Sequence, residues 1–291
     1  MRQFLIDWVS DIFGSGLFSS VESILNWNPS SGEFTTVWGI ICNVYENVCV
    51  PIGMGLVLIY FMVNVIEKST QQQSIDVEHI IKLLLKLFIG LYLIEHGLEI
   101  MASIYSLSFG LVKGIAGLQS DDAAYGGPGN DVVAAIWKQL TGEDINKDVK
   151  WGVLDVFSKF IPVFFQLILP WIFTLIMKIV VYFVCYTRLI EFYLKTAAAP
   201  IALSDFFTEG VHSNGWKFVK GYIATALQAG IIMLAVVVFN GIAGGIMNGG
   251  VAGILDIGYM LFTIKYLALG IATIGVMLKS LSLAKELVGV N

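Results

Sequence analysis

The sequence predicts an all-α, polytopic membrane helix bundle with about five transmembrane helices, an outer N-terminus and an inner C-terminus. Of its 291 residues, 57% are apolar and 13% charged, and its mean hydropathy is +0.80. A soluble domain carries about a quarter charged residues. The apolar residues form long runs, as membrane spans do. The uneven distribution of Lys and Arg supplies the orientation.

The first segment, residues 1–44, is predicted to be an outer or interfacial amphipathic segment. It is expected to remain on the protein, because Asp7 and Asp11 interrupt the apolar stretch that a signal peptide needs. A helix lying in the membrane interface and a short helix packed on the bundle both fit the pattern. Its apolar positions at helical spacing are Phe4, Leu5, Trp8, Val9 and Ile12.

Five apolar stretches are long enough to cross a bilayer core, which needs about 20 residues. Two of them occupy residues 45–113, and the second contains Glu95, His96 and Glu99. The other three occupy residues 159–291. The predicted spans are 47–66, 83–112, 160–187, 218–242 and 258–278.

The positive charges predict which connecting segments lie in the cytoplasm. Segments 67–86, 188–220 and 279–291 hold nine Lys and Arg residues, whereas segments 1–44, 114–158 and 245–257 hold four. Positive charge favours the inner side. The first group is therefore predicted to be cytoplasmic, as five spans with an outer N-terminus require.

This topology makes residues 114–158 a central extracytoplasmic loop. It holds seven acidic residues against three lysines. Such a loop can hold a small docking element but not an independent enzyme domain. Its acidic balance suits partner proteins better than phosphate groups.

No catalytic motif, phosphate-binding loop, dinucleotide fingerprint or metal-binding motif is present, so we expect no enzyme activity, cofactor or metal. The three histidines, His79, His96 and His212, are not spaced as a ligand set. Cys42 lies just before the first predicted span and Cys49 lies at its start. Their seven-residue spacing places them about 10 Å apart in a helix, too far for a disulfide unless the helix breaks, so free thiols are expected.

Four ionisable residues are predicted at membrane depth: Glu95, Glu99, Lys178 and Lys265. Each costs on the order of 3 kcal/mol when it faces lipid, so each should face protein or water. They could line a polar conduit or form ion pairs between helices. Their numerical balance favours pairing.

Glycine recurs every four residues at Gly241, Gly245, Gly249 and Gly253. This spacing allows two helices, or two subunits, to pack closely. The same stretch also contains the turn signal Asn248-Gly249-Gly250. Close packing up to Gly245 followed by a turn is compatible with both interpretations.

The stretch after the third predicted span, "RLIEFYLKTAAAPIALSDFF", combines charges with a proline. Arg188, Glu191 and Lys195 share one helix face, predicted to lie at the cytoplasmic boundary. Pro200 disfavours continuation of the helix, so residues 196–216 are predicted to form an elbow. The elbow, the following "GWKFVK" and the start of the next span, "YIATALQAGI", resemble the TrbL family. Its members are inner-membrane subunits of type IV secretion and conjugation machines, equivalent to the sixth VirB component. The compact loop and short tail resemble the form found in conjugative elements of Gram-positive bacteria.

The resemblance implies a non-enzymatic, multi-pass subunit of the bacterial cytoplasmic membrane. It implies a homo-oligomer, arranged as a ring, that helps form the passage for a DNA–protein or protein substrate, with ATPases supplied by other subunits. One alternative is a secondary transporter with a midplane site at the Pro200 helix break, to which buried Glu95, Glu99, Lys178 and Lys265 would contribute. Another is a structural or lysis-type membrane protein.

Overall fold

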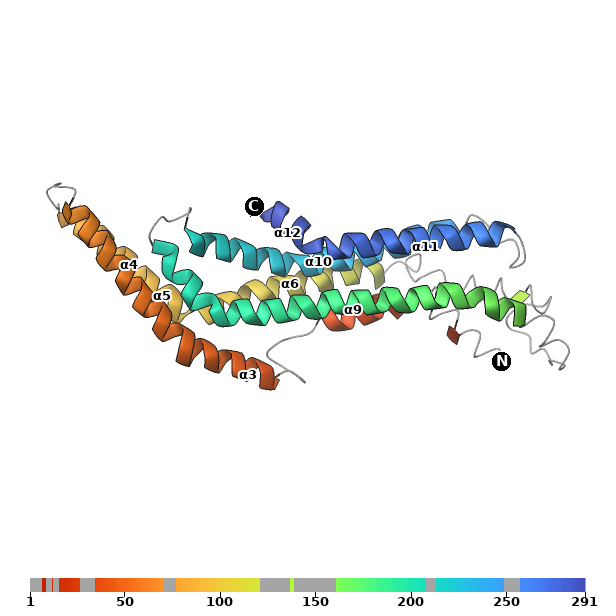
Figure 1. The fold of residues 1–291 in the computed structure, drawn as a ribbon, viewed down its shortest axis with the longest axis horizontal. Helices are drawn as coiled ribbons and strands as arrows, with labels where there is room; N and C mark the ends of the chain where they lie inside the picture. The colour runs from red at the N-terminus through yellow and green to blue at the C-terminus, as the bar shows by residue number, and fades with distance from the viewer. Residues whose placement is uncertain are drawn as a thin grey trace. The chain divides into compact units, whose positions relative to one another are not determined.

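The computed structural model describes residues 7–8, 12, 16–26, 35–70, 77–120, 137–138, 161–207, 213–248 and 257–290. Across these residues the chain forms helices and no strands (Figure 1). The predicted all-α class is therefore confirmed.

The helices follow the apolar runs of the sequence. Two short non-α helical segments occur among them, the π-helix η2 and the 3-10 helix η5. In chain order the elements are α2 (Gly16–Leu25), α3 (Thr35–Val44), η2 (Tyr45–Cys49), α4 (Val50–Thr70), α5 (Val77–Glu95), α6 (Gly97–Ser120), α9 (Ile161–Leu203), η5 (Ser204–Phe207), α10 (Asn214–Asn248), α11 (Ile257–Leu278) and α12 (Ser280–Val288).

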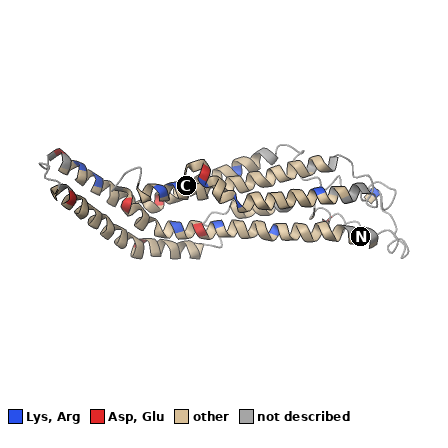
Figure 2. Cartoon of the chain, turned by 45° about the horizontal axis from the view of Figure 1, so that its top comes forward, with Lys and Arg blue, Asp and Glu red and all other residues tan. Residues whose placement is uncertain are grey.

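Four helical stretches in the described part of the chain are long and apolar enough to cross a membrane. They are Thr35–Glu67, Gly97–Gly117, Leu167–Phe206 and Asn214–Ala243. A fifth arises if Thr263–Leu278 and Ser280–Val288, bent by 49°, form one span. Charged residues are sparse along these helices (Figure 2). The chain is a polytopic membrane protein, whereas the orientation of its termini stays a prediction.

The second predicted span, 83–112, is wrong as a single helix. The helix breaks at His96, and the apolar candidate starts at Gly97, so it contains Glu99 but neither Glu95 nor His96. The apolar pattern continues across this point and gives no sign of a break. The local feature that favours a break is Gly97, because glycine is a poor helix former.

The first candidate span begins earlier than predicted, at Thr35. Cys42 therefore lies within it and not before it, and Cys49 lies further inside it. Both are free thiols, as expected. Similarly, α6 continues to Ser120, beyond the predicted start of the central loop at residue 114.

Pro200 does not end its helix. α9 continues through Pro200 to Leu203, and the elbow begins with η5 (Ser204–Phe207). A proline inside a helix removes one backbone hydrogen bond and bends the axis. Figure 1 shows the last turns of α9 inclined to the helix before them.

The chain divides into two compact units, and α6, α9 and α10 each contribute residues to both. Unit 2 comprises residues 27–110, 186–229 and 281–291. Its core is rich in aromatic side chains, which bury large apolar areas. Buried members are Tyr45, Val57, Ile94, Met101, Tyr105, Leu189, Phe192, Tyr193, Ala199, Leu203 and Tyr222.

Unit 1 comprises residues 1–26, 111–185 and 230–280. In it the hydroxyl of Tyr266 donates to the carbonyl oxygen of Ile12 at 2.9 Å. The ring of Phe173 lies directly against Gly270, where a side chain would collide with it. These contacts join α9, α11 and the N-terminal segment within this unit.

Several sequence predictions fall outside the described residues. These are most of the N-terminal amphipathic pattern and of the loop 114–158, together with His212, Gly249 and Gly253. In the loop, Trp137 and Lys138 are helical and the Trp137 side chain is buried.

Candidate functional site

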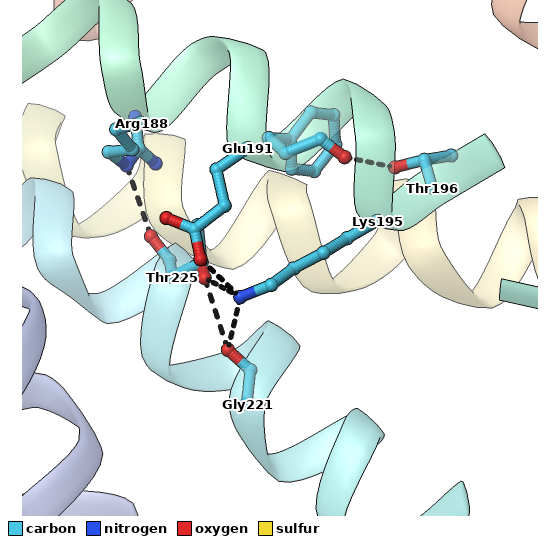
Figure 3. A network of polar contacts seen from close by, with 7 residues as sticks. Arg188, Glu191, Lys195, Thr196, Gly221 and Thr225 are labelled. Carbon is cyan, nitrogen blue, oxygen red and sulfur yellow. Dashed lines mark hydrogen bonds and ion pairs between the residues drawn. The ribbon is translucent and has the colours of Figure 1, made fainter. Parts of the chain in front are cut away.

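The charged end of α9 lies in a buried polar cluster of unit 2 (Figure 3). We call this the α9 polar cluster. It joins α9 to α6 and α10 through hydroxyl groups and backbone carbonyls. Its members are Tyr105, Ser108, Arg188, Glu191, Lys195, Thr196, Gly221, Tyr222 and Thr225.

Arg188 is the most deeply buried charge of the cluster, with 3% of its surface exposed. Its Nε donates to the carbonyl oxygen of Thr225 at 3.0 Å. Its Nη2 donates to the hydroxyl of Ser108. The guanidinium carbon lies 5.7 Å from the ring centroid of Tyr105, within cation–π range. One side chain on α9 thus contacts both α6 and α10.

Lys195, two turns further along α9, makes a second set of contacts. Its Nζ forms an ion pair with Glu191 at 2.7 Å. It also donates to the hydroxyl of Thr225 at 2.7 Å and to the carbonyl oxygen of Gly221 at 3.3 Å. The backbone carbonyl of Thr225 therefore accepts a hydrogen bond from Arg188, and the hydroxyl of Thr225 accepts one from Lys195.

A pair of hydroxyls extends the cluster toward α6. Those of Thr196 and Tyr222 lie 3.0 Å apart, and either can donate to the other. The Tyr222 hydroxyl also reaches the carbonyl oxygen of Met101 at 3.3 Å. These residues are buried, so such contacts satisfy groups that would otherwise lose hydrogen bonds to water.

Arg188, Glu191 and Lys195 share a helix face, as predicted from their spacing, and that face packs against other helices. Their place at the cytoplasmic boundary stays a prediction, because the candidate span Leu167–Phe206 has 40 residues and a bilayer core needs about 20. Helical spacing places side chains on one face without specifying what covers that face. Partners from distant segments, Ser108 and Thr225, decide it here.

Glu95 and Glu99, predicted to share a face, line one cavity of about 250 Å³ in unit 2. Tyr45, Glu46, Val50 and Leu98 complete its lining. Glu95 and Glu99 are both exposed, on opposite sides of the break at His96. Among the described residues, no group of three or more His, Cys, Asp or Glu side chains could hold a metal ion.

Lys178 and Lys265 belong to unit 1, whereas Glu95 and Glu99 belong to unit 2. Pairing between these acids and lysines, and a conduit lined by them, stay predictions. Of the glycine series, Gly241 and Gly245 lie on α10, and no neighbouring atom lies within 4 Å of the point that a Cβ would occupy at either residue. That open surface is compatible with packing against another helix.

Comparison with known families places these features in context. The family of TrbL/VirB6 plasmid conjugal transfer like proteins matches residues 25–200. The chain belongs to this TrbL/VirB6 family. No curated protein and no solved structure matches it.

Membership makes this chain a component of a type IV secretion or conjugation system, located in the bacterial inner membrane. The matched region of the TrbL/VirB6 chain contains α3 to α6 and most of α9. It therefore includes Ser108, Arg188 and Lys195, but not their partner Thr225 on α10. The family resemblance inferred from the sequence is confirmed.

Sequence reasoning missed the neutral partners of the cluster. Ser108, Thr225 and Tyr222 are hydroxyl residues within apolar helices, where Ser and Thr commonly bond to their own helix backbone. Thr225 does so too, donating to the carbonyl oxygen of Gly221 at 3.1 Å. Nothing in the local sequence distinguishes them from other hydroxyl residues in the spans.

Proposed function

We propose that this TrbL/VirB6 chain is a channel or scaffold subunit that helps pass a DNA–protein or protein substrate across the cytoplasmic membrane. The family match over residues 25–200 carries the proposal, together with four or five helices able to span a membrane. ATPases would be supplied by other subunits of the machine. The form found in Gram-positive conjugative elements is the proposed type.

The chemistry of the α9 polar cluster favours a structural role over catalysis. Arg188 and Lys195 are engaged by a carboxylate, hydroxyls and carbonyl oxygens, all of which stabilise a positive charge. Such contacts between helices fix the bundle geometry in an apolar medium. A scaffold that holds a passage needs this fixed geometry.

We propose further that the subunit forms a homo-oligomer whose copies are arranged as a ring around the passage. Helix α9 supports this, because it presents a long exposed apolar face to lipid or to another subunit. Exposed members of that face include Phe165, Leu169, Ile172, Ile176, Ile179, Phe183, Ile190 and Leu194. The loop 114–158 is the proposed docking element for partner proteins.

The role in transport is tested by cross-linking the chain to DNA during mating. Cells carrying the intact system are treated with formaldehyde, the chain is precipitated, and the transferred strand is amplified. We expect recovery of that strand, and loss of recovery when the coupling ATPase is deleted. Absence of the strand in cells that transfer DNA normally would contradict a passage role.

A second test distinguishes a defect in substrate passage from a defect in subunit assembly. We expect Glu95→Gln combined with Glu99→Gln to lower transfer while the subunit still assembles, because both carboxylates line one cavity. Glu67→Gln, at an exposed position on α4, is the matched control.

The proposed ring is tested by measuring the mass of the purified protein. If the protein has the mass of a monomer in both detergent and lipid, it does not form a ring.

The transporter alternative depended on a helix break at Pro200. α9 remains helical through this residue, and Pro200 itself is buried. The helix break that favoured a midplane site is therefore missing, and Glu95 and Glu99, which the alternative took as buried, are exposed.

A further inference from the structure

Two helices of unit 2 are interrupted next to each other. Between α3 and α4 the chain forms a π-helical turn, Tyr45–Cys49, and between α5 and α6 it breaks at His96. The π-turn replaces the α-helical hydrogen-bond pattern over five residues. At His96 the chain bends, although its N–H still bonds to Tyr92 and its carbonyl to Ile100. π-turns and breaks are places where helices change direction.

The Tyr45 side chain connects the two interruptions. Its hydroxyl donates to the carbonyl oxygen of Ile94 at 2.7 Å, and 1% of the residue is exposed. Carbonyls in the last turn of a helix lack their usual partners. Tyr45 on one interrupted helix thus satisfies a backbone carbonyl at the end of the other.

Gly97 permits this approach. A Cβ built at Gly97 would lie 2.5 Å from the Tyr45 hydroxyl oxygen and 3.2 Å from Cδ1 of Leu203. The first distance is too short for any side chain, so even alanine would displace the hydroxyl. The contact therefore depends on the glycine at the start of α6.

Beyond the interruptions, α4 and α5 lie side by side (Figure 1), and we call this pair of helices the α4–α5 hairpin. Many of its apolar side chains are exposed, among them Met62 and Phe88. The hairpin contacts the end of α9 at Gly53, which lies against Pro200, and it also contacts η5. The cavity of about 250 Å³ lies beside the interruptions, so the pivot is not closely packed on that side.

The geometry points to a hinge at this level: the α4–α5 hairpin rotates about the π-turn 45–49 and His96, and the hydrogen bond from Tyr45 to Ile94 holds it in the observed position. The hairpin is the moving part because the two interruptions separate it from α3 and α6. Tyr45 is the latch because its bond joins the two pivot points. The hinge does not depend on whether the subunit conducts substrate.

Hydrogen–deuterium exchange of the full chain in phosphatidylcholine nanodiscs tests the latch. Tyr45→Phe keeps the ring and removes the hydroxyl. We expect exchange about fivefold faster in peptides covering residues 42–53 and 92–101, the effect of losing one neutral hydrogen bond. Tyr186→Phe, which alters an exposed tyrosine of α9, should leave these peptides unchanged. Unchanged exchange in Tyr45→Phe would overturn the latch.

Gly97→Ala provides a second variant that retains the hydroxyl but displaces it. Alanine favours helix more than glycine does, so faster exchange cannot come from backbone propensity. We expect the same two peptides to exchange faster, whereas Gly110→Ala, with open space around it, should not change them. If Tyr45→Phe accelerates exchange throughout the chain, the result for Gly97→Ala distinguishes the two explanations. Faster exchange of Gly97→Ala in the two peptides alone would support the hinge. Exchange at the wild-type rate in these peptides would contradict it.

Discussion

Arg188 contributes to packing as much through its shape as through its charge. Its planar guanidinium donates in two directions, to Thr225 on α10 and to Ser108 on α6, and lies near the face of Tyr105. Lysine has a single charged nitrogen at the end of a flexible chain, so it cannot reproduce this arrangement. The geometry thus requires arginine at this position.

Replacing Arg188 by alanine should therefore destabilise unit 2. We expect a loss of about 2 kcal/mol, since two hydrogen bonds between helices and one cation–π contact disappear. Arg188→Lys should lie between alanine and the wild type. Thermal unfolding in lipid measures this, with Lys82→Ala at an exposed position as control. Equal stability of all four proteins would contradict the assigned role.

Glu191 and Lys195 should show coupled effects. The two side chains are about three-quarters buried and form an ion pair at 2.7 Å. Removing only one charge leaves the other partly buried and without its ionic partner. We expect Glu191→Gln and Lys195→Met each to destabilise the protein, and the double variant to be about 1 kcal/mol more stable than their sum predicts. Strict additivity in a double-mutant cycle would show that the pair contributes nothing.

At the scale of elements, close backbone contact determines how α4 meets α9. A Cβ built at Gly53 would lie 2.6 Å from the carbonyl oxygen of Pro200. Backbone atoms cannot move aside as the end of a flexible side chain can. Small residues at such crossings allow helices to approach closely.

Gly53→Ala should separate α4 from the end of α9. We expect destabilisation on the order of 1–3 kcal/mol, the usual effect of overpacking a tight contact. Gly55→Ala, two residues away in the same helix, has open space around it and should be neutral or slightly stabilising. Unfolding of both variants in the same lipid provides the comparison. Indistinguishable stabilities would indicate that the crossing adjusts without cost.

At the scale of the whole molecule, the positive charges predict the orientation in the membrane. Residues 67–86 and 279–291 should face the cytoplasm, and residues 114–158 should face outward, because Lys and Arg favour the inner side. Helix α12 follows α11 after a bend of 49°, so it either continues the last span or lies along the inner surface.

Labelling of single cysteines by a membrane-impermeant maleimide tests this topology. In a chain whose native cysteines are replaced by serine, Asp122→Cys should react in intact cells. Thr70→Cys and Leu287→Cys, both at exposed positions, should react only after permeabilisation. The reverse pattern would mean that the charge bias does not set the orientation.

The sequence by itself determined the class, the presence of long apolar helices and the family. The first two depend on composition and on the length of apolar runs, which are local properties. The family resemblance depends on the elbow motif and the start of the following span. The third, fourth and fifth predicted spans correspond to α9, α10 and α11, although α9 extends well past residue 187. The helical face shared by Arg188, Glu191 and Lys195 was also predictable, because it follows from helical spacing alone.

Only the tertiary structure decided what covers that face and where the helices are interrupted. Thr225 and Ser108 lie 37 and 80 residues from Arg188 in the chain, and Ile94 lies 49 residues from Tyr45. Hydrogen bonds across such separations depend on how helices pack, which an apolar run does not encode. The contact of Tyr45 with Gly97 beside the break at His96 is of the same kind, because it exists only after η2 and α6 have come together.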